Sequence, residues 1–158
     1  MNLVAQPLSQ EAFSAFGEVI EVGGAYVLIN AGKCRRYTDL MQADIVDGAV
    51  GLSLFEAEIR PMPHHCDLLE RHPLGNQCFM PMGNSSYLVI VAPDQGGVPG
   101  TPVAFLAQGH QGVNIARNTW HGVLCPISGT GLFTVLDRIG TGANLEEHVL
   151  AQPVTITV

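Results

Sequence analysis

The segment ERHPLGNQ, which begins at Glu70, carries side chains that could act in acid–base chemistry within an otherwise apolar chain. Glu70 and His72 are two residues apart, so on a strand both side chains point to the same face. Pro73 and Gly75 predict a turn, which could return Gln77 to the same place. A carboxylate, an imidazole and an amide in one place could transfer protons or hold a metal ion. The alternative is a hydrogen-bonded pair of glutamate and histidine on the surface.

A second candidate segment, NAGKCRRY, runs from Asn30 to Tyr37 and is strongly basic. Lys33, Arg35 and Arg36 are three of the seven bases in the chain. An arginine beside a tyrosine hydroxyl suits the capture of a carboxylate, because the planar guanidinium offers a fork of donors. A solvated turn explains the same residues equally well, since basic clusters usually face water.

A third segment, VNIARNTWHGVL, contains Arg117, the only tryptophan Trp120, and His121. Two interpretations stay open. The tryptophan and histidine could belong to the core and to a cap, or they could form a pocket wall with a titrating group. Spacing alone does not pair His121 with His72.

The elements that must position these residues are mostly strands. One helix is predicted over QEAFSAF, residues 10–16, capped by Ser9 and ended by Gly17. Its predicted inner face consists of Ala12, Phe13 and Phe16. Short apolar runs bounded by Gly, Pro, Asn or Asp follow, and these predict strands. The predicted strands are Tyr26–Asn30, Gly51–Ile59, Tyr87–Ala92, Val103–Ala107, Gly122–Ile127, Leu132–Asp137 and Val154–Val158. Many short strands separated by turns favour a β-sandwich or β-barrel.

The bulk properties narrow the class of function. A chain of 158 residues fits one domain, residues 1–158. Its net charge of −7 disfavours nucleic acid as a partner but allows a small anionic substrate. The longest apolar run is too short to span a membrane, and no signal peptide is recognised. The four cysteines stand singly, which indicates reduced thiols and a cytoplasmic protein.

The three polar segments together resemble the ureidoglycolate lyase family, also called ureidoglycolate hydrolases. The resemblance covers nearly the whole chain, including PLSQEAFSAFGEVIE near the start and TVLDR near the end. It implies a cupin-like fold, a β-barrel or double sheet with a short N-terminal helix, and a homodimer. It also implies that the stretch from Glu70 through His72 and Gln77 is an altered first cupin motif, with His121 as the late histidine. His72, Gln77 and His121 would then hold a divalent metal, with nickel suggested by the family, if a metal is present.

The chain departs from the family at four positions. Many members have histidine where this chain has Asp67, and tyrosine and histidine often stand in place of Ile115 and Ala116. A second histidine often stands in place of Gly122. These changes remove hydrogen-bonding or ligand capacity near the expected cavity, so they bear on turnover more than on the fold.

The resemblance implies cleavage of ureidoglycolate to glyoxylate and urea, a step in the catabolism of allantoin and purines. His72 and His121 are the candidates for the acid and the base, in an order that the sequence leaves open. Glu70 would orient a histidine or hold the urea N–H groups. The expected substrate-binding residues are Arg36, Tyr37, Lys33, Gln77, Arg117 and Trp120, and Trp120 would wall the pocket.

Two alternatives remain at this point. The first is a hydrolase that releases ammonia and carbon dioxide from the same substrate, which needs an activated water and hence a metal. The second is a cupin-like protein that binds a small carboxylate without turning it over, and the four departures motivate it. In every case the partner is a small carboxylate, with no nucleic acid and no membrane.

Overall fold

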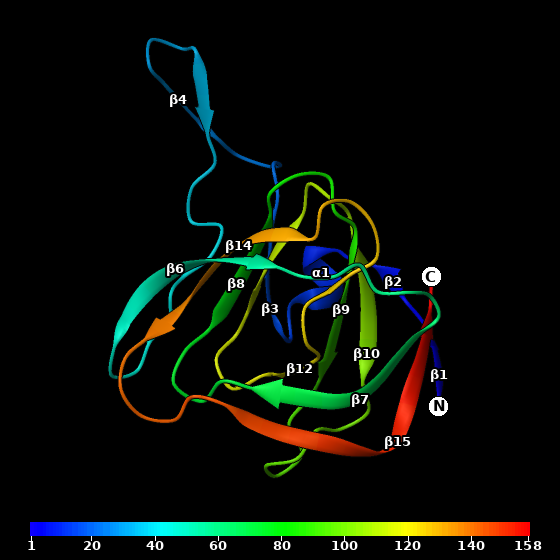
Figure 1. Cartoon of the computed structure of the whole chain (residues 1–158). Coiled ribbons are helices and arrows are strands. Elements are labelled where there is room, and N and C mark those ends of the chain that lie inside the picture. The colour runs from blue at the N-terminus through cyan, green and yellow to red at the C-terminus, as the bar shows by residue number, and fades with distance from the viewer.

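The computed structural model describes residues 1–158 and is built mainly from strands. Two sheets curve toward each other to form a barrel, which confirms the mainly β, cupin-like fold (Figure 1). The larger sheet has the order β1 (Asn2–Val4), β15 (Glu146–Thr157), β7 (His64–Arg71), β12 (Trp120–His121), β9 (Tyr87–Ala92), β10 (Val103–Ala107) and β2 (Gln6–Pro7), and β13 (Cys125–Pro126) also pairs with β9.

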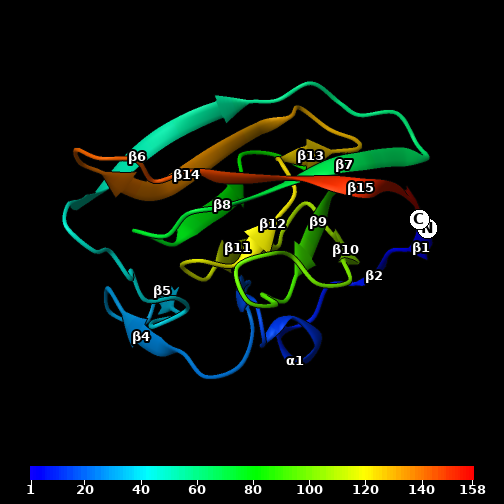
Figure 2. The ribbon, with the colours of Figure 1, turned by 90° about the horizontal axis from the view of Figure 1, so that it is seen from below.

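The smaller sheet supplies the other wall of the barrel. Its order is β3 (Gly17–Ile20), β11 (Gly112–Ile115), β8 (Gln77–Pro81), β14 (Leu132–Ile139) and β6 (Ala49–Glu56). A separate hairpin, β4 (Val27–Ile29) with β5 (Cys34–Arg36), belongs to neither sheet. The hairpin projects away from the barrel in Figure 1, and Figure 2 shows it to one side of the two sheets.

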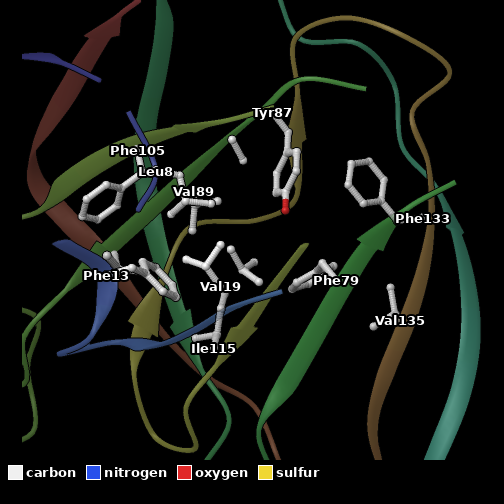
Figure 3. Close-up of a cluster of buried hydrophobic side chains, with 13 residues drawn as sticks. Leu8, Phe13, Val19, Phe79, Tyr87, Val89, Phe105, Ile115, Phe133 and Val135 are labelled. Atoms are coloured by element: carbon white, nitrogen blue, oxygen red, sulfur yellow. The ribbon is translucent and has the colours of Figure 1, made fainter. Parts of the chain in front are cut away.

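The main core lies between the two sheets and is rich in aromatic side chains. Tyr87 of β9 and Phe133 of β14 meet edge to face, with ring centroids 5.0 Å apart (Figure 3). The Tyr87 hydroxyl donates to the backbone carbonyl of Gln111 at 2.9 Å, so the buried polar group is satisfied. Burying such a ring stabilises the fold by roughly 1.5–3 kcal/mol. A second apolar cluster, which includes Leu69 and Trp120, packs against the opposite face of β9.

The N-terminal helix is shorter than predicted. α1 spans Gln10–Phe13, with Ser9 as the N-cap accepting a hydrogen bond from the Ala12 amide. Phe13 is fully buried, as predicted, but Ala12 is exposed and Phe16 lies in the following turn. The helix ends early because β3 begins at Gly17 and must pair with β11. Gly17 has a φ of +150°, and a Cβ there would meet the Asn114 carbonyl oxygen at 1.9 Å.

The predicted strands differ from the observed ones mainly in length. β9 and β10 have the predicted bounds. The predicted strand Gly122–Ile127 is wrong as a continuous element, because only the short β12 and β13 form around it. The predicted strand at the C-terminus is the end of the much longer β15. No helix of the structure has the length and apolar character that a transmembrane segment needs.

Candidate active site and metal centre

Strands β7 and β12 bring together the three residues that were expected to carry the chemistry. His121 of β12 pairs directly with Glu70 of β7, and opposite residues of an antiparallel pair point to the same face. His72 follows β7 by one residue. The imidazole rings of His72 and His121 have centroids 5.2 Å apart. One ligand atom from each of Glu70, His72 and His121 lies within 4.8 Å of the others, so the three form one group, called here the acceptor triad.

The hydrogen bonds of the two imidazoles set their tautomers. His72 Nδ1 lies 2.7 Å from the backbone carbonyl oxygen of Asn144, and His121 Nδ1 lies 3.1 Å from that of Gly122. A carbonyl oxygen only accepts, so each Nδ1 carries the proton and donates it. Each Nε2 therefore presents a lone pair when its ring is neutral. Both Nε2 atoms are buried and have no hydrogen-bond partner in the chain.

Burial controls the electrostatics of the triad. The pKa of His121 is lowered to about 4, chiefly by burial, with the hydrogen bond to Gly122 opposing the shift and the nearby His72 adding to it. His121 is thus neutral at pH 7. Burial raises the pKa of Glu70, His72 counteracts this, and Glu147, directly opposite on β15, adds to it. The side chains of Glu70 and His72 remain 19% and 16% exposed, whereas the Nε2 atoms of both imidazoles are buried.

The triad fits a divalent cation. Two imidazole lone pairs and one carboxylate converge, and no donor from the chain faces them. Such a set of acceptors is satisfied either by protons or by a metal ion, and two histidines with one carboxylate suit zinc, nickel or iron. The Oε1 atom of Gln77 on β8 is likewise buried without a hydrogen-bond partner. Its Nε2 donates to Asp137 Oδ2 at 3.3 Å.

Three residues that support the site were not among those expected from the sequence. Asn144 accepts from His72 through its backbone oxygen, and its Oδ1 accepts from the Leu74 amide at 2.7 Å. Arg138 is buried and donates to the backbone carbonyls of Val46 and Thr141. These hydrogen bonds hold the loop before β6 and the loop after β14 beside the turn at Gly75. Asp137 holds the Gln77 amide. Only Asp137 could have been found from the sequence, because it lies two residues after the core residue Val135 on β14 and therefore on the same face.

Trp120 and Arg71 lie outside the triad. Trp120 neighbours His121 on β12, so its side chain points to the opposite face and packs in the second apolar cluster. The Arg71 guanidinium stacks over the Trp120 ring at 4.4 Å and pairs with Asp94 at 2.8 Å and Glu146 at 2.6 Å. Both ion pairs of Arg71 thus lie within the chain. The structure does not bring Trp120 against the imidazoles as a wall.

Arg117 lies at the rim beside the turn that follows His72. Its Nε pairs with Asp44 Oδ2 at 2.9 Å, and its Nη1 donates to the Pro73 carbonyl at 3.2 Å. The Asn118 amide donates to the His72 carbonyl at 2.9 Å, which ties this loop to the triad. Arg117 is thus close in the fold to the triad, but its guanidinium is already engaged.

The basic segment forms the turn and second strand of the projecting hairpin. Lys33 and Arg36 are exposed, Tyr37 is half-buried, and none of these three contributes to the triad. Arg35 stacks over Tyr26 at 5.0 Å. Within one chain, the structure therefore separates the expected carboxylate-binding bases from the expected acid and base.

The four departures from the family pattern all lie outside the triad. Asp67 and Ala116 are exposed, and Gly122 is half-buried against Ile90. Ile115 is buried in the main core and pairs with Gln77. Two of the four adjoin a residue with an unpaired buried polar atom: Ile115 lies opposite Gln77, and Gly122 follows His121 in the chain.

Known proteins resemble this chain over nearly its whole length. The sequence is 51% identical over 157 residues to a ureidoglycolate lyase of Rhodobacter capsulatus, with 98% of each chain covered. It is 47% identical over 154 residues to ureidoglycolate lyase 2 of Rhizobium meliloti, covering 96% of this chain and 94% of that one. It is 45% identical to a ureidoglycolate lyase of Chelativorans over 158 residues, covering 98% and 96%. The profile of the family described as ureidoglycolate lyase matches residues 1–157, and the chain therefore belongs to the ureidoglycolate lyase family.

Proposed function

We propose that this chain cleaves ureidoglycolate to glyoxylate and urea, as a step in allantoin and purine catabolism. The relatives named above are ureidoglycolate lyases and cover nearly the whole chain. The observation that carries the proposal is the acceptor triad of Glu70, His72 and His121, with atoms within 4.8 Å of one another. The four departures from the family pattern leave this triad intact.

The reaction makes three demands on the protein. A base takes the proton of the substrate hydroxyl, and the oxygen electrons form the new carbonyl as the carbon–nitrogen bond breaks. An acid then protonates the departing nitrogen, because a urea anion is a poor leaving group. A cation holds the carboxylate.

The pKa shifts indicate which residues serve as the base and the acid. His121, with a pKa of about 4, stays neutral, and its Nε2 accepts a hydrogen bond from the substrate. A proton-transferring group works best with a pKa near the working pH. Burial raises the pKa of Glu70 toward that range, and its Oε1 lies 3.9 Å from His72 Nε2. We assign the proton movements to the pair of Glu70 and His72.

As an alternative to these proton transfers, the same residues would hold a divalent metal, nickel among the candidates. Glu70, His72 and His121 would supply the ligands, with the Gln77 amide oxygen as a fourth. A bound metal would polarise the substrate oxygens and make the hydroxyl proton easier to remove. The backbone carbonyls of Asn144 and Gly122 would then orient the two imidazoles toward it.

The test is an assay on purified protein with racemic ureidoglycolate. Urea and glyoxylate appearing in equal amounts support the lyase. Ammonia in place of urea would indicate the hydrolase, which the metal-competent triad also permits. Binding of glyoxylate without any turnover would leave a small-carboxylate binding protein. Running the assay with and without a chelator reports whether a metal is needed.

We also propose that the protein works as a homodimer in the cytoplasm. Exposed apolar side chains on β6 support a second copy, because contiguous apolar surface usually marks an interface. All four cysteines are free, which suits a reducing compartment. Sedimentation of the purified protein tests the first statement, and fractionation of the cells tests the second.

A further inference from the structure

The strands β4 and β5 are the only two that belong to neither sheet of the barrel. The chain leaves the smaller sheet after its edge strand β3, forms the hairpin, and returns to the opposite edge strand β6 (Figures 1 and 2). β4 and β5 pair only with each other. Val27 and Leu28 are each 57% exposed. A two-stranded ribbon with exposed apolar residues is marginal in water by itself, so this hairpin needs a surface to pack on.

The outer face of the smaller sheet is apolar and uncovered. Leu52 and Leu54 of β6 are 68% and 60% exposed, and Val50 on the same face is also exposed. In register beside them on β14 stand Leu136 and Thr134. Because a twofold interface uses the same patch on both copies, an apolar sheet face can cover its own counterpart. The apolar hairpin joined to this sheet would extend the same interface.

The distribution of charge favours a second copy of this chain as the partner that covers the hairpin and the outer face of the smaller sheet. Lys33, Arg35 and Arg36 form no ion pair, although the chain as a whole carries a net charge of −7. Arg71 and Arg117 are paired with carboxylates within their own chain. The basic hairpin and the acidic remainder of the chain are thus complementary, and this favours association between copies.

The triad has no free cation for the substrate carboxylate, whereas the hairpin carries three unpaired bases. The polar atoms of the triad are acceptors, and the substrate carboxylate needs a cation. Arg138, which is buried nearby, donates to backbone carbonyls, and Arg117 is held by Asp44. The remaining unpaired bases of the hairpin are exposed and carry no interaction with their own barrel.

We propose that each active site is completed by the second copy: Arg36, with Lys33, on the hairpin of one protomer binds the substrate carboxylate at the triad of its partner. The proposal rests on the proposed function, because it assigns the carboxylate site of that reaction. The apolar residues of the hairpin dock on the partner, and its basic residues reach Glu70 and His72, whose side chains are partly exposed.

The test is subunit complementation. His72→Ala and Arg36→Ala chains are co-expressed with different tags, and the heterodimer is purified through both. Each homodimer should be nearly inactive. In the heterodimer, one site collects both lesions and the other is intact, so about half of the wild-type activity should return. If each site uses its own hairpin, every site carries one lesion, and a heterodimer without activity overturns the proposal.

Two controls separate this proposal from the proposed function. Arg60→Ala, an exposed base outside the hairpin, should retain full activity, and an Arg36→Ala homodimer with wild-type activity would overturn the proposal. Leu52→Asp should yield a folded monomer with little activity, whereas a wild-type protein that is already a monomer refutes the shared site. A dimeric wild type that cleaves no ureidoglycolate contradicts the proposed function instead. In that case the shared site is tested by measuring the binding of glyoxylate to the same heterodimer by calorimetry.

Discussion

His72 and His121 come from different strands, yet their rings lie 5.2 Å apart and each donates its Nδ1 proton to a backbone carbonyl. Both rings therefore present Nε2 lone pairs within one buried group. The backbone, rather than another side chain, holds the two tautomers. This arrangement ties the chemistry of the site directly to the register of the barrel.

Replacement of either histidine should remove most of the activity. His72→Ala and His121→Ala are each expected to lower kcat/KM by about a hundredfold or more, because each removes a group that contacts the reacting atoms. The measurement is urea release under saturating and limiting substrate. His110→Ala is the control, since its side chain is 74% exposed on a loop. Rates within a few-fold of wild type in both active-site variants would reject the assignment.

Metal binding should depend on the triad. After removal of metals with a chelator and dialysis against nickel or zinc, the wild type is expected to retain about one ion per chain. His121→Ala and Glu70→Gln should lose it, because each removes or weakens one of few ligands. Elemental analysis counts the ion, and the visible absorption of bound nickel or cobalt reports its ligands independently of activity. Equal retention by His121→Ala and by His110→Ala would contradict the site.

The stability of the metal-free protein should fall as the pH falls from about 6.5 to about 4. The pKa of His121 is lowered to about 4 in the folded state, so the unfolded chain binds this proton first. Folding stability therefore rises with pH in that window, by on the order of 3 kcal/mol for this residue. Burial also raises the pKa of Glu70, which acts in the opposite direction and reduces the net slope.

The measurement is urea unfolding at several pH values with a chelator present. His121→Asn retains a donor for the Gly122 carbonyl but does not titrate, so its stability should vary less over the same window. A wild type and an Asn variant with parallel pH profiles would show that His121 is not buried in the neutral form.

Arg71 should act in stability rather than in catalysis. Its guanidinium stacks on Trp120 and pairs with Asp94 and Glu146, which are partly exposed, so water weakens the ion pairs. Arg71→Ala is expected to lower the free energy of unfolding by about 1–3 kcal/mol, chiefly through the lost stacking and packing. Arg60→Ala should change it by less than about 0.5 kcal/mol. A large loss of kcat in Arg71→Ala at full folding would place Arg71 in the reaction.

Local patterns predicted individual strands where the strand is apolar throughout. β9 and β10 were predicted with their observed bounds because Pro and Gly delimit two continuous apolar runs. The helix was predicted too long, because its periodicity continues through Phe16 while pairing of β3 with β11 takes the chain from Gly17 onward. The run Gly122–Ile127 was apolar but too irregular to pair along its length.

The alternation of side chains along a strand also predicted part of the site from the sequence. Glu70 and His72 share a face because successive side chains of a strand point to opposite sides. The same rule places Trp120 on the other face from His121, so its predicted role as a wall beside the imidazoles was the weaker inference. Asp137 could have been found because it lies two residues after Val135 on β14 and so shares its face.

The sequence by itself determined the class of fold, the family, and the local pair of Glu70 and His72, because these follow from patterns within a few residues or along the whole chain. Only the tertiary structure decided that His121 faces Glu70, that backbone carbonyls of Asn144 and Gly122 set the tautomers, and that the basic hairpin stands apart from its own triad. These relationships join residues distant in sequence, and strand register and loop closure, which no local spacing specifies, bring them together.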